Sequence, residues 1–161
     1  MNKKYKKLYK NILNEYEKLS TCARLKVAAL LVKDGRVVSV GFNGVASGKK
    51  HCNDIFKHDE KQNVYSIDGK IVTSDEWYNE HHVFSENNEI HAEVNTLMFA
   101  LRSGLIVDDH ELIISISPCI NCAKMIISSG IRRVYYKEIY DRNGSLGLDL
   151  LVENGIDVVK L

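Results

Sequence analysis

The chain contains 161 residues, of which 45% are hydrophobic and 27% are charged, and its formal net charge at pH 7 is +1. This length and composition are typical of one globular domain built around a single core. The near-neutral charge gives no electrostatic reason to expect polymeric nucleic acid as a partner. No segment approaches the roughly 18 consecutive apolar residues of a membrane span, so we expect no membrane association.

Apolar residues recur along the chain with the periods of helices and strands. The expected elements, in chain order, are a helix around 5–19, a hairpin of strands at 27–32 and 37–40, a second hairpin turning at 68–69, a helix from 74 to about 84, a helix at 91–101, a strand at 112–116, a helix at 119–129, a strand at 133–136, a helix at 148–153 and a strand at 156–159. Strands that alternate with helices after a leading hairpin favour an α/β fold. We expect three layers, α/β/α, with a mixed sheet of about five strands in the middle.

The segment from about residue 53 to 90 is more polar than its surroundings. It has too few apolar residues for a core of its own, so we expect an insert on a single domain that spans residues 1–161. Ser74 is expected to cap the helix within this insert. The helix that follows the insert is predicted to bury one apolar face. That face consists of Val94, Leu97, Met98 and Leu101.

Two short patterns open predicted helices and carry side chains that bind zinc. They are His91-Ala92-Glu93 and Pro118-Cys119-Ile120-Asn121-Cys122. Two cysteines three residues apart at a helix start direct both sulfurs to one place, where free backbone N–H groups stabilise thiolates. One histidine and two cysteines leave a fourth zinc position for water, which is typical of a catalytic site. Glu93 is placed to move protons beside that water.

Cys119 and Cys122 taken alone would fit a pair of buried thiols or half of a structural zinc site as well as they fit a catalytic site. The upstream His91-Ala92-Glu93 favours catalysis, because H-x-E followed by P-C-x-x-C is the known signature of zinc deaminases. This signature does not distinguish cytosine from adenine, nor a nucleotide from a nucleoside or tRNA. Other segments are more informative about the substrate.

The chain resembles the deoxycytidylate (dCMP) deaminases, members of the cytidine deaminase-like superfamily, over nearly its whole length. The matching segments are residues 20–24, 27–32, 41–44, 48–52, 89–93, 147–151 and 155–156, together with Tyr140. The resemblance implies zinc-dependent hydrolysis of dCMP to dUMP and ammonia, which supplies dUMP for dTMP synthesis. It also implies that Asn43 hydrogen-bonds the sugar, that Tyr140 stacks on the cytosine and that Ala92 contacts the substrate. Asn43 as a plain turn residue and Tyr140 as a core aromatic are the alternatives.

Two departures from the family pattern concern the loops around the substrate. Ala46 stands where the family often has proline, and Asp141 stands where it often has arginine, with Arg142 one place later. The expected contact to the 5′-phosphate is therefore lost or moved. Arg24 is our first candidate for that contact. The other candidates are Lys49 and Lys50, and a solvated surface charge is the alternative for each cation.

Some members of the family, notably from phage, carry a second, structural zinc. The matching positions here are Cys22, Cys52, His81 and Glu89. Four protein ligands would leave no open position on the metal, and such a site would stabilise an insert with a thin core. Free thiols, His82 in place of His81, and Glu89 as a helix-entry charge are the alternatives.

Family members are commonly hexamers that dCTP activates and dTTP inhibits, with Mg²⁺, at a site between subunits. By resemblance, the triphosphate contact would involve Gly41, Asn43 and Gly44, because glycines let backbone N–H groups approach phosphates. Phe99 and Arg102 would pack against a neighbouring subunit and transmit effector binding. A core phenylalanine and an exposed arginine are the alternative interpretation.

Two rival functions differ from dCMP deamination. The first is a deaminase of another nucleoside, base or tRNA adenosine, against which stand the near-neutral charge, the length and the polar insert. The second is a non-catalytic zinc-binding interaction module, against which stands Glu93, since a scaffold needs no proton shuttle. We expect a cytoplasmic protein, because residues 1–10 lack an apolar run and the cysteines fit thiols or metal ligands better than disulfides.

Overall fold

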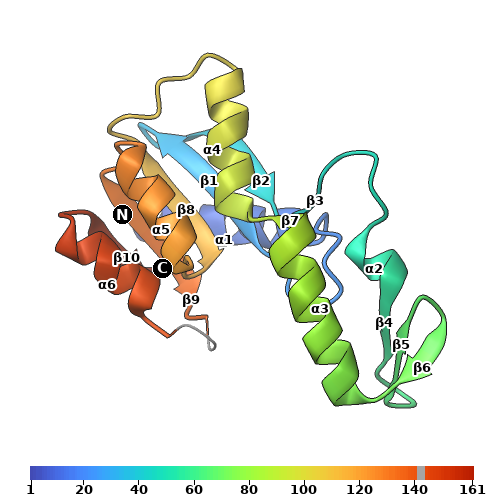
Figure 1. Ribbon diagram of the computed structural model, residues 1–161. Helices are drawn as coiled ribbons and strands as arrows, with labels where there is room; N and C mark the ends of the chain where they lie inside the picture. Colours follow the sequence, from blue (N-terminus) through green and yellow to red (C-terminus); the bar gives the residue numbers. More distant parts are fainter. Residues whose placement is uncertain (141–143) are drawn as a thin grey trace.

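The computed structural model describes residues 1–140 and 144–161. Its elements run in the order α1 (Lys3–Glu17), β1 (Ala28–Lys33), β2 (Arg36–Phe42), β3 (Gly44–Val45), α2 (Cys52–Ile55), β4 (Phe56–Asp59), β5 (Val64–Ile67), β6 (Lys70–Val72), α3 (Ser74–Asn88), β7 (Glu89–Ile90), α4 (Ala92–Arg102), β8 (Glu111–Ile116), α5 (Ile120–Ser128), β9 (Arg133–Glu138), α6 (Leu146–Glu153) and β10 (Asp157–Lys160). Figure 1 shows these elements in a main body and a projecting lobe.

A five-stranded sheet with the order β10-β9-β8-β1-β2 forms the centre of the main body. Strand β1 pairs antiparallel with both β2 and β8, whereas β8, β9 and β10 pair parallel to one another. The expected mixed sheet of about five strands is therefore confirmed.

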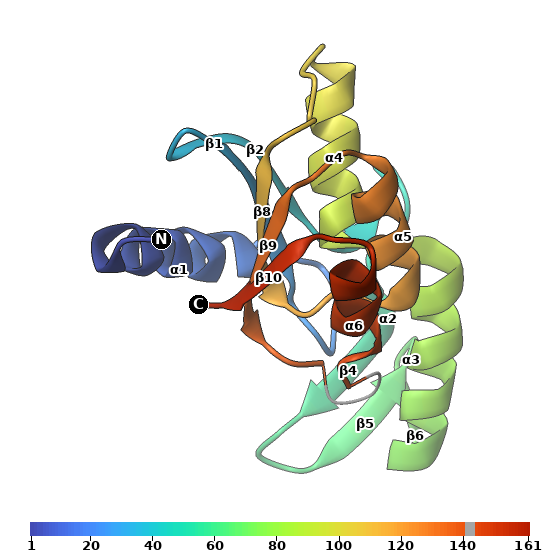
Figure 2. The ribbon, with the colours of Figure 1, turned by 90° about the vertical axis from the view of Figure 1, so that its left-hand side faces the viewer.

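Helices cover both faces of this sheet, as Figure 2 shows with α1 on one side and α4, α5 and α6 on the other. Strand β1 contributes side chains to the cores on both faces of the sheet, because successive side chains of a strand point to opposite faces. Ala28, Leu30 and Val32 lie in the core under α1. Ala29 and Leu31 lie in the core under the other three helices. The three-layer α/β/α arrangement is confirmed by this division into two cores.

The polar insert forms the projecting lobe, in which the three-stranded sheet β4-β5-β6 packs beside α3. The hairpin expected at 68–69 is present between β5 and β6. The buried core of the lobe is small and consists of Cys22, Cys52, Phe56 and Trp77. Two of these four residues are cysteines.

Two local expectations are wrong. Thr73, not Ser74, caps α3, because the Thr73 hydroxyl accepts a hydrogen bond from the Glu76 backbone N–H at 3.2 Å. The helix also continues to Asn88, beyond the expected end near residue 84.

The buried face of α4 also differs from the prediction. It consists of Ala92, Glu93, Thr96, Leu97 and Ala100. Met98 and Leu101 are 40% and 48% exposed. The prediction of the buried face from the hydrophobic pattern was wrong because this helix buries small and polar residues against the sheet and exposes larger apolar ones.

None of the helices in the described part of the chain combines the length and apolar character that crossing a membrane requires.

Candidate active site

His91, Cys119 and Cys122 come together in space although they lie on different elements. His91 Nδ1 is 3.6 Å from Cys119 Sγ and 3.3 Å from Cys122 Sγ. The three donor atoms all lie within 4.8 Å of one another, a spacing at which one metal ion can contact them all. One imidazole nitrogen and two sulfurs form a donor set suited to zinc, and three protein ligands leave one position for water.

Two helix starts create this cluster, which we call the first cluster. His91 is the N-cap of α4 and Cys119 is the N-cap of α5, and both have extended backbone angles. Cys119 Sγ accepts a hydrogen bond from the Cys122 backbone N–H at 3.5 Å, so the sulfur acts as the capping group of α5. The unpaired N–H groups of a first helical turn favour negative charge at such a sulfur.

Hydrogen bonds within the first cluster shift the pKa values of all three side chains. The hydrogen bond from the Cys122 thiol lowers the pKa of Cys119 to about 4. Donation of this hydrogen bond raises the pKa of the Cys122 thiol. The hydrogen bond with the Cys119 thiolate raises the pKa of His91 to about 9. A metal cation would displace these protons, because its ligands must be thiolates and a neutral imidazole.

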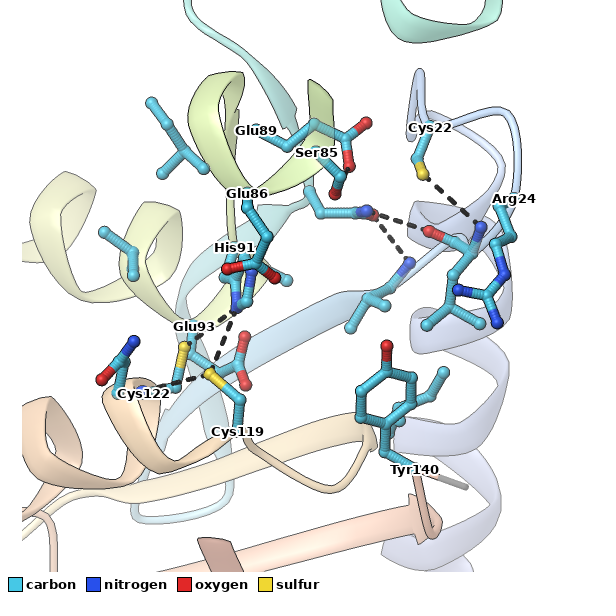
Figure 3. A pocket seen from close by; sticks show the side chains of 18 of the residues that line it. Cys22, Arg24, Ser85, Glu86, Glu89, His91, Glu93, Cys119, Cys122 and Tyr140 are labelled. Carbon is cyan, nitrogen blue, oxygen red and sulfur yellow. Dashed lines mark hydrogen bonds between the residues drawn. The ribbon is translucent and has the colours of Figure 1, made fainter. Parts of the chain in front are cut away.

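Glu93 lies beside the first cluster, in the first turn of α4, and is only 4% exposed. Burial raises the pKa of its carboxyl group. A raised pKa brings a carboxyl group closer to the pH at which it can both accept and release protons efficiently. Figure 3 shows Glu93 directed toward the two sulfurs. Its position therefore fits a proton-transfer group that is not itself a ligand.

A second cluster joins Cys22, Cys52 and His81, whose donor atoms also lie within 4.8 Å of one another. Cys22 Sγ is 3.5 Å from His81 Nε2, and all three side chains are buried. The hydrogen bond from the Cys52 thiol lowers the pKa of Cys22 to about 3. The neighbouring His82 is exposed and lies outside the cluster.

Glu89 lies beside the second cluster but is not among the three donors grouped there. Its Oε2 accepts a hydrogen bond from the Ser85 hydroxyl at 2.8 Å. Its Oε1 is buried and has no hydrogen-bond partner among the described residues. Burial raises the pKa of Glu89 to about 7, and the Cys22 thiolate adds to this effect. A buried carboxylate oxygen without a partner, next to two cysteines and a histidine, suits a fourth metal ligand.

One cleft runs between the two clusters, and its lining includes Cys22, Arg24, His91, Glu93 and Tyr140. Figure 3 shows the Tyr140 ring directed into the cleft, with Arg24 on the side away from the first cluster. The cleft lies where β8 and β9 end, because Cys119 follows β8 and Tyr140 follows β9. Ligands commonly bind at the carboxyl ends of parallel strands in α/β sheets.

Asn43 also faces this cleft, but most of its amide is already used. Its Oδ1 accepts hydrogen bonds from the Ser20 hydroxyl at 2.7 Å and the Val27 backbone N–H at 2.8 Å. Its Nδ2 donates to the Leu25 carbonyl at 2.9 Å. Asn43 therefore holds the segment that carries Cys22 and Arg24, and one amide hydrogen is left for a ligand. Ala92 lines the cleft as well.

The residues expected to contact an effector or a neighbouring subunit do not all lie together. Gly41, Phe99 and Arg102 line a separate surface hollow beside α4 and β2, whereas Asn43 lines the cleft. Gly41 has a packing role, because a Cβ atom there would lie 2.5 Å from the Thr96 backbone nitrogen. Gly44 pairs with Ile90 between β3 and β7. Phe99 is 59% exposed, so it is not the core phenylalanine of the alternative interpretation.

Three further positions complete the comparison with the sequence-based expectations. Asp141 and Arg142 lie outside the described residues. Ser117 was not among the predicted site residues, and its hydroxyl accepts a hydrogen bond from the Tyr140 backbone N–H at 2.8 Å. In the sequence, only its position directly before Pro118-Cys119 indicates that Ser117 lies near the site.

Comparison with known proteins agrees with this geometry. Residues 2–138 match the family model of the cytidine and deoxycytidylate deaminase zinc-binding region. The deoxycytidylate deaminase of Enterobacteria phage T2 is 33% identical over 155 residues, covering 86% of this chain and 82% of that protein. Its counterpart in Enterobacteria phage T4 is 34% identical over 155 residues, covering 86% and 80%. The crystal structure of dCMP deaminase from cyanophage S-TIM5 with dCMP and dUMP has a TM-score of 0.74 at 29% identity, covering 100% and 99%.

Proposed function

The chain belongs to the family of cytidine and deoxycytidylate deaminases, and from this we propose that it hydrolyses dCMP to dUMP and ammonia. The observation that carries the proposal is the first cluster, His91, Cys119 and Cys122, with the buried Glu93 beside it at one end of an open cleft. The relatives from phages T2 and T4 and the cyanophage structure with dCMP and dUMP support the choice of substrate.

Zinc held by His91, Cys119 and Cys122 supplies, when bound, a water that ionises near neutral pH. Glu93 accepts one proton from the water and delivers it to the base, and it then accepts a second proton from the same oxygen and delivers it to the departing amino group. Burial of Glu93 serves this role, since it raises the pKa of the carboxyl group. The overall change balances as dCMP plus water giving dUMP plus ammonia.

Tyr140, Asn43, Ala92 and Arg24 orient the nucleotide in this proposal. Tyr140 stacks on the cytosine, Ala92 contacts it, and the remaining amide hydrogen of Asn43 meets the sugar. Arg24 binds the 5′-phosphate, and its place in the cleft lining away from the first cluster supports this role. The Arg24 guanidinium lies 5.5 Å from the Tyr78 ring centre, which restrains the direction of the side chain.

The substrate is tested with purified, zinc-loaded protein and four substrates: dCMP, CMP, deoxycytidine and cytidine. Loss of the cytosine absorbance follows turnover directly. We expect the highest kcat/KM for dCMP. A higher kcat/KM for either nucleoside would contradict the assignment, and the absence of turnover on all four would favour the non-catalytic zinc module.

A second metal at Cys22, Cys52, His81 and Glu89 is also part of the proposal. Three donors within reach of one ion and the unpartnered Oε1 of Glu89 support it. Its role is structural, because four protein ligands leave no place for substrate or water. The lobe that it would stabilise adds one wall to the catalytic cleft.

Regulation and assembly complete the proposal. We expect a homo-hexamer, activated by dCTP and inhibited by dTTP with Mg²⁺, and Gly41, Asn43, Gly44, Phe99 and Arg102 as contacts of the effector or of a neighbouring subunit. The hollow lined by Gly41, Phe99 and Arg102 supports an effector or subunit contact there. The test is dCMP turnover with each triphosphate, and an unchanged rate with both would contradict regulation.

The cellular role that we propose is the supply of dUMP for dTMP synthesis in the cytoplasm. None of the four cysteines forms a disulfide, and this supports a reducing compartment. We treat residues 1–161 as one deaminase domain with the insert as its lobe.

A further inference from the structure

Ser117 joins the ends of two parallel strands at the bottom of the cleft. It follows β8 directly and is only 4% exposed. Its backbone N–H donates to the Glu138 carbonyl at 2.8 Å, at the end of β9. Its hydroxyl accepts from the Tyr140 backbone N–H at 2.8 Å. The side chain thus continues the pairing of β8 and β9 past the point where backbone pairing stops.

The residue next to Ser117 is Pro118, and the residue after that is Cys119 of the first cluster. The hydrogen bond to Ser117 therefore ties the backbone of Tyr140 to the same short segment that contains Cys119. A shift at Ser117 would change the distance between the Tyr140 ring and the first cluster. Figure 3 shows Cys119 and Tyr140 among the side chains that line the same pocket.

The chain beyond Tyr140 returns to the same segment. The Gly144 backbone N–H donates to the Tyr140 carbonyl at 2.9 Å. A Cβ atom on Gly147, near the start of α6, would lie 1.9 Å from the Pro118 carbonyl oxygen. The start of α6 therefore lies against Pro118, so Tyr140 and Gly147 both contact the Ser117-Pro118 segment.

From these contacts we propose that Ser117 is a positioning residue, whose hydroxyl sets the place of the Tyr140 ring against the bound base. The inference rests on the proposed function, because it takes Tyr140 as the residue that stacks on cytosine. Ser117 itself touches neither the proton path nor the metal. Its loss should therefore weaken substrate binding more than it slows the chemical step.

The first test is Ser117→Ala in the zinc-loaded, full-length protein. We expect KM for dCMP and the dissociation constant of dUMP to rise about fivefold, the size expected for one lost hydrogen bond. The kcat should change less than twofold and the zinc content should not change. Ser117→Thr keeps a hydroxyl and should restore KM. Equal losses in kcat and kcat/KM, or no rescue by threonine, would overturn the inference.

Ser115→Ala is the matched control, because Ser115 lies two residues earlier and is equally buried. Its hydroxyl bonds the Ala28 backbone N–H at 2.9 Å, within the sheet and away from Tyr140. This variant should lose stability without a change in KM. If it raises KM as much as Ser117→Ala does, the effect is general loosening of the sheet, and the inference fails.

Two readouts separate this inference from the proposed function. Amide hydrogen exchange at Tyr140 needs no substrate, and Ser117→Ala should accelerate it at least fivefold while Ser115→Ala should not. In a Tyr140→Ala background, Ser117→Ala should add no further rise in KM. Failure of the proposed function would appear in the wild-type protein, as absent or non-nucleotide turnover. Failure of the inference would appear as unchanged exchange or additive KM effects beside an active wild type.

Discussion

Glu93 combines nearly complete burial with a position beside three metal-binding side chains. Replacing Glu93 with glutamine keeps the size of the side chain and removes the carboxyl group that accepts and releases a proton. We expect Glu93→Gln to lower kcat for dCMP at least 100-fold, within the range of general acid–base catalysis of about 10² to 10⁴. Zinc content and the midpoint of thermal unfolding should stay close to wild type. Substantial remaining turnover would contradict the role given to Glu93.

Arg24 is the residue that contacts the 5′-phosphate in the proposal. We expect Arg24→Ala to raise KM for dCMP about 10- to 100-fold, since a hydrogen bond to a charged group contributes about 1.5–3 kcal/mol. Turnover of deoxycytidine, which lacks the phosphate, should not change. Lys26→Ala is the control, because Lys26 is an exposed cation of the same segment that is absent from the lining of the cleft. An equal effect of both variants would point to general charge rather than to Arg24.

At the scale of single residues, local sequence was most informative where a side chain works next to its own helix start. His91 and the two cysteines of the first cluster could be predicted because spacing at a helix terminus fixes their direction. The hydrogen bonds of Asn43 and of Ser117 could not be predicted in the same way. Their partners lie 16 to 23 residues away along the chain, so only the folded sheet brings them together.

Among the elements, α4 and β2 approach each other closely because Gly41 has no side chain. A Cβ atom there would lie 2.5 Å from two atoms of Thr96. We expect Gly41→Ala to lower the free energy of unfolding by about 1–3 kcal/mol through overpacking, measured by urea denaturation. Val38→Ala, at an exposed position of the same strand, should change stability far less. Equal stability of the two variants would contradict this account of the contact.

The lobe depends on the second cluster more than the main body does, because its own core is small. We expect Cys52→Ser to lower the zinc content from about two to about one per chain, measured by elemental analysis. Proteolysis should then begin within residues 53–90, while the zinc of the first cluster is kept. A wild-type content of one zinc per chain would contradict the second site.

The exposed side of α4 shows why element faces were harder to predict than the elements themselves. Periodicity placed the helix correctly, but Met98 and Leu101 point outward. The residues that face the sheet include Glu93 and Thr96, and the Thr96 hydroxyl forms hydrogen bonds there. The Thr96 hydroxyl donates to the Ala29 carbonyl at 3.1 Å, and a hydrophobic pattern cannot predict this contact.

For the molecule as a whole, the apolar surface of α4 bears on assembly. Phe99 is 59% exposed, and Met98 and Leu101 lie beside it on the helix. If the chain forms the proposed hexamer, we expect Phe99→Glu to reduce the mass measured by light scattering, because a buried charge without a partner destabilises an interface. Ile71→Glu is the control, since Ile71 is 79% exposed on the lobe. A wild-type protein that is monomeric at micromolar concentration would contradict the proposed assembly.

The order of strands in the central sheet has a consequence for how the chain folds during synthesis. Strand β1 is paired on one side by β2, its neighbour in sequence, and on the other by β8. Strand β8 leaves the ribosome only after the whole lobe and α4 have been made. Until then, one edge of the apolar strand β1 has no partner strand. Unpaired strand edges can pair with other nascent chains and cause aggregation. Slower growth at low temperature should therefore raise the yield of folded protein, whatever the metal supply.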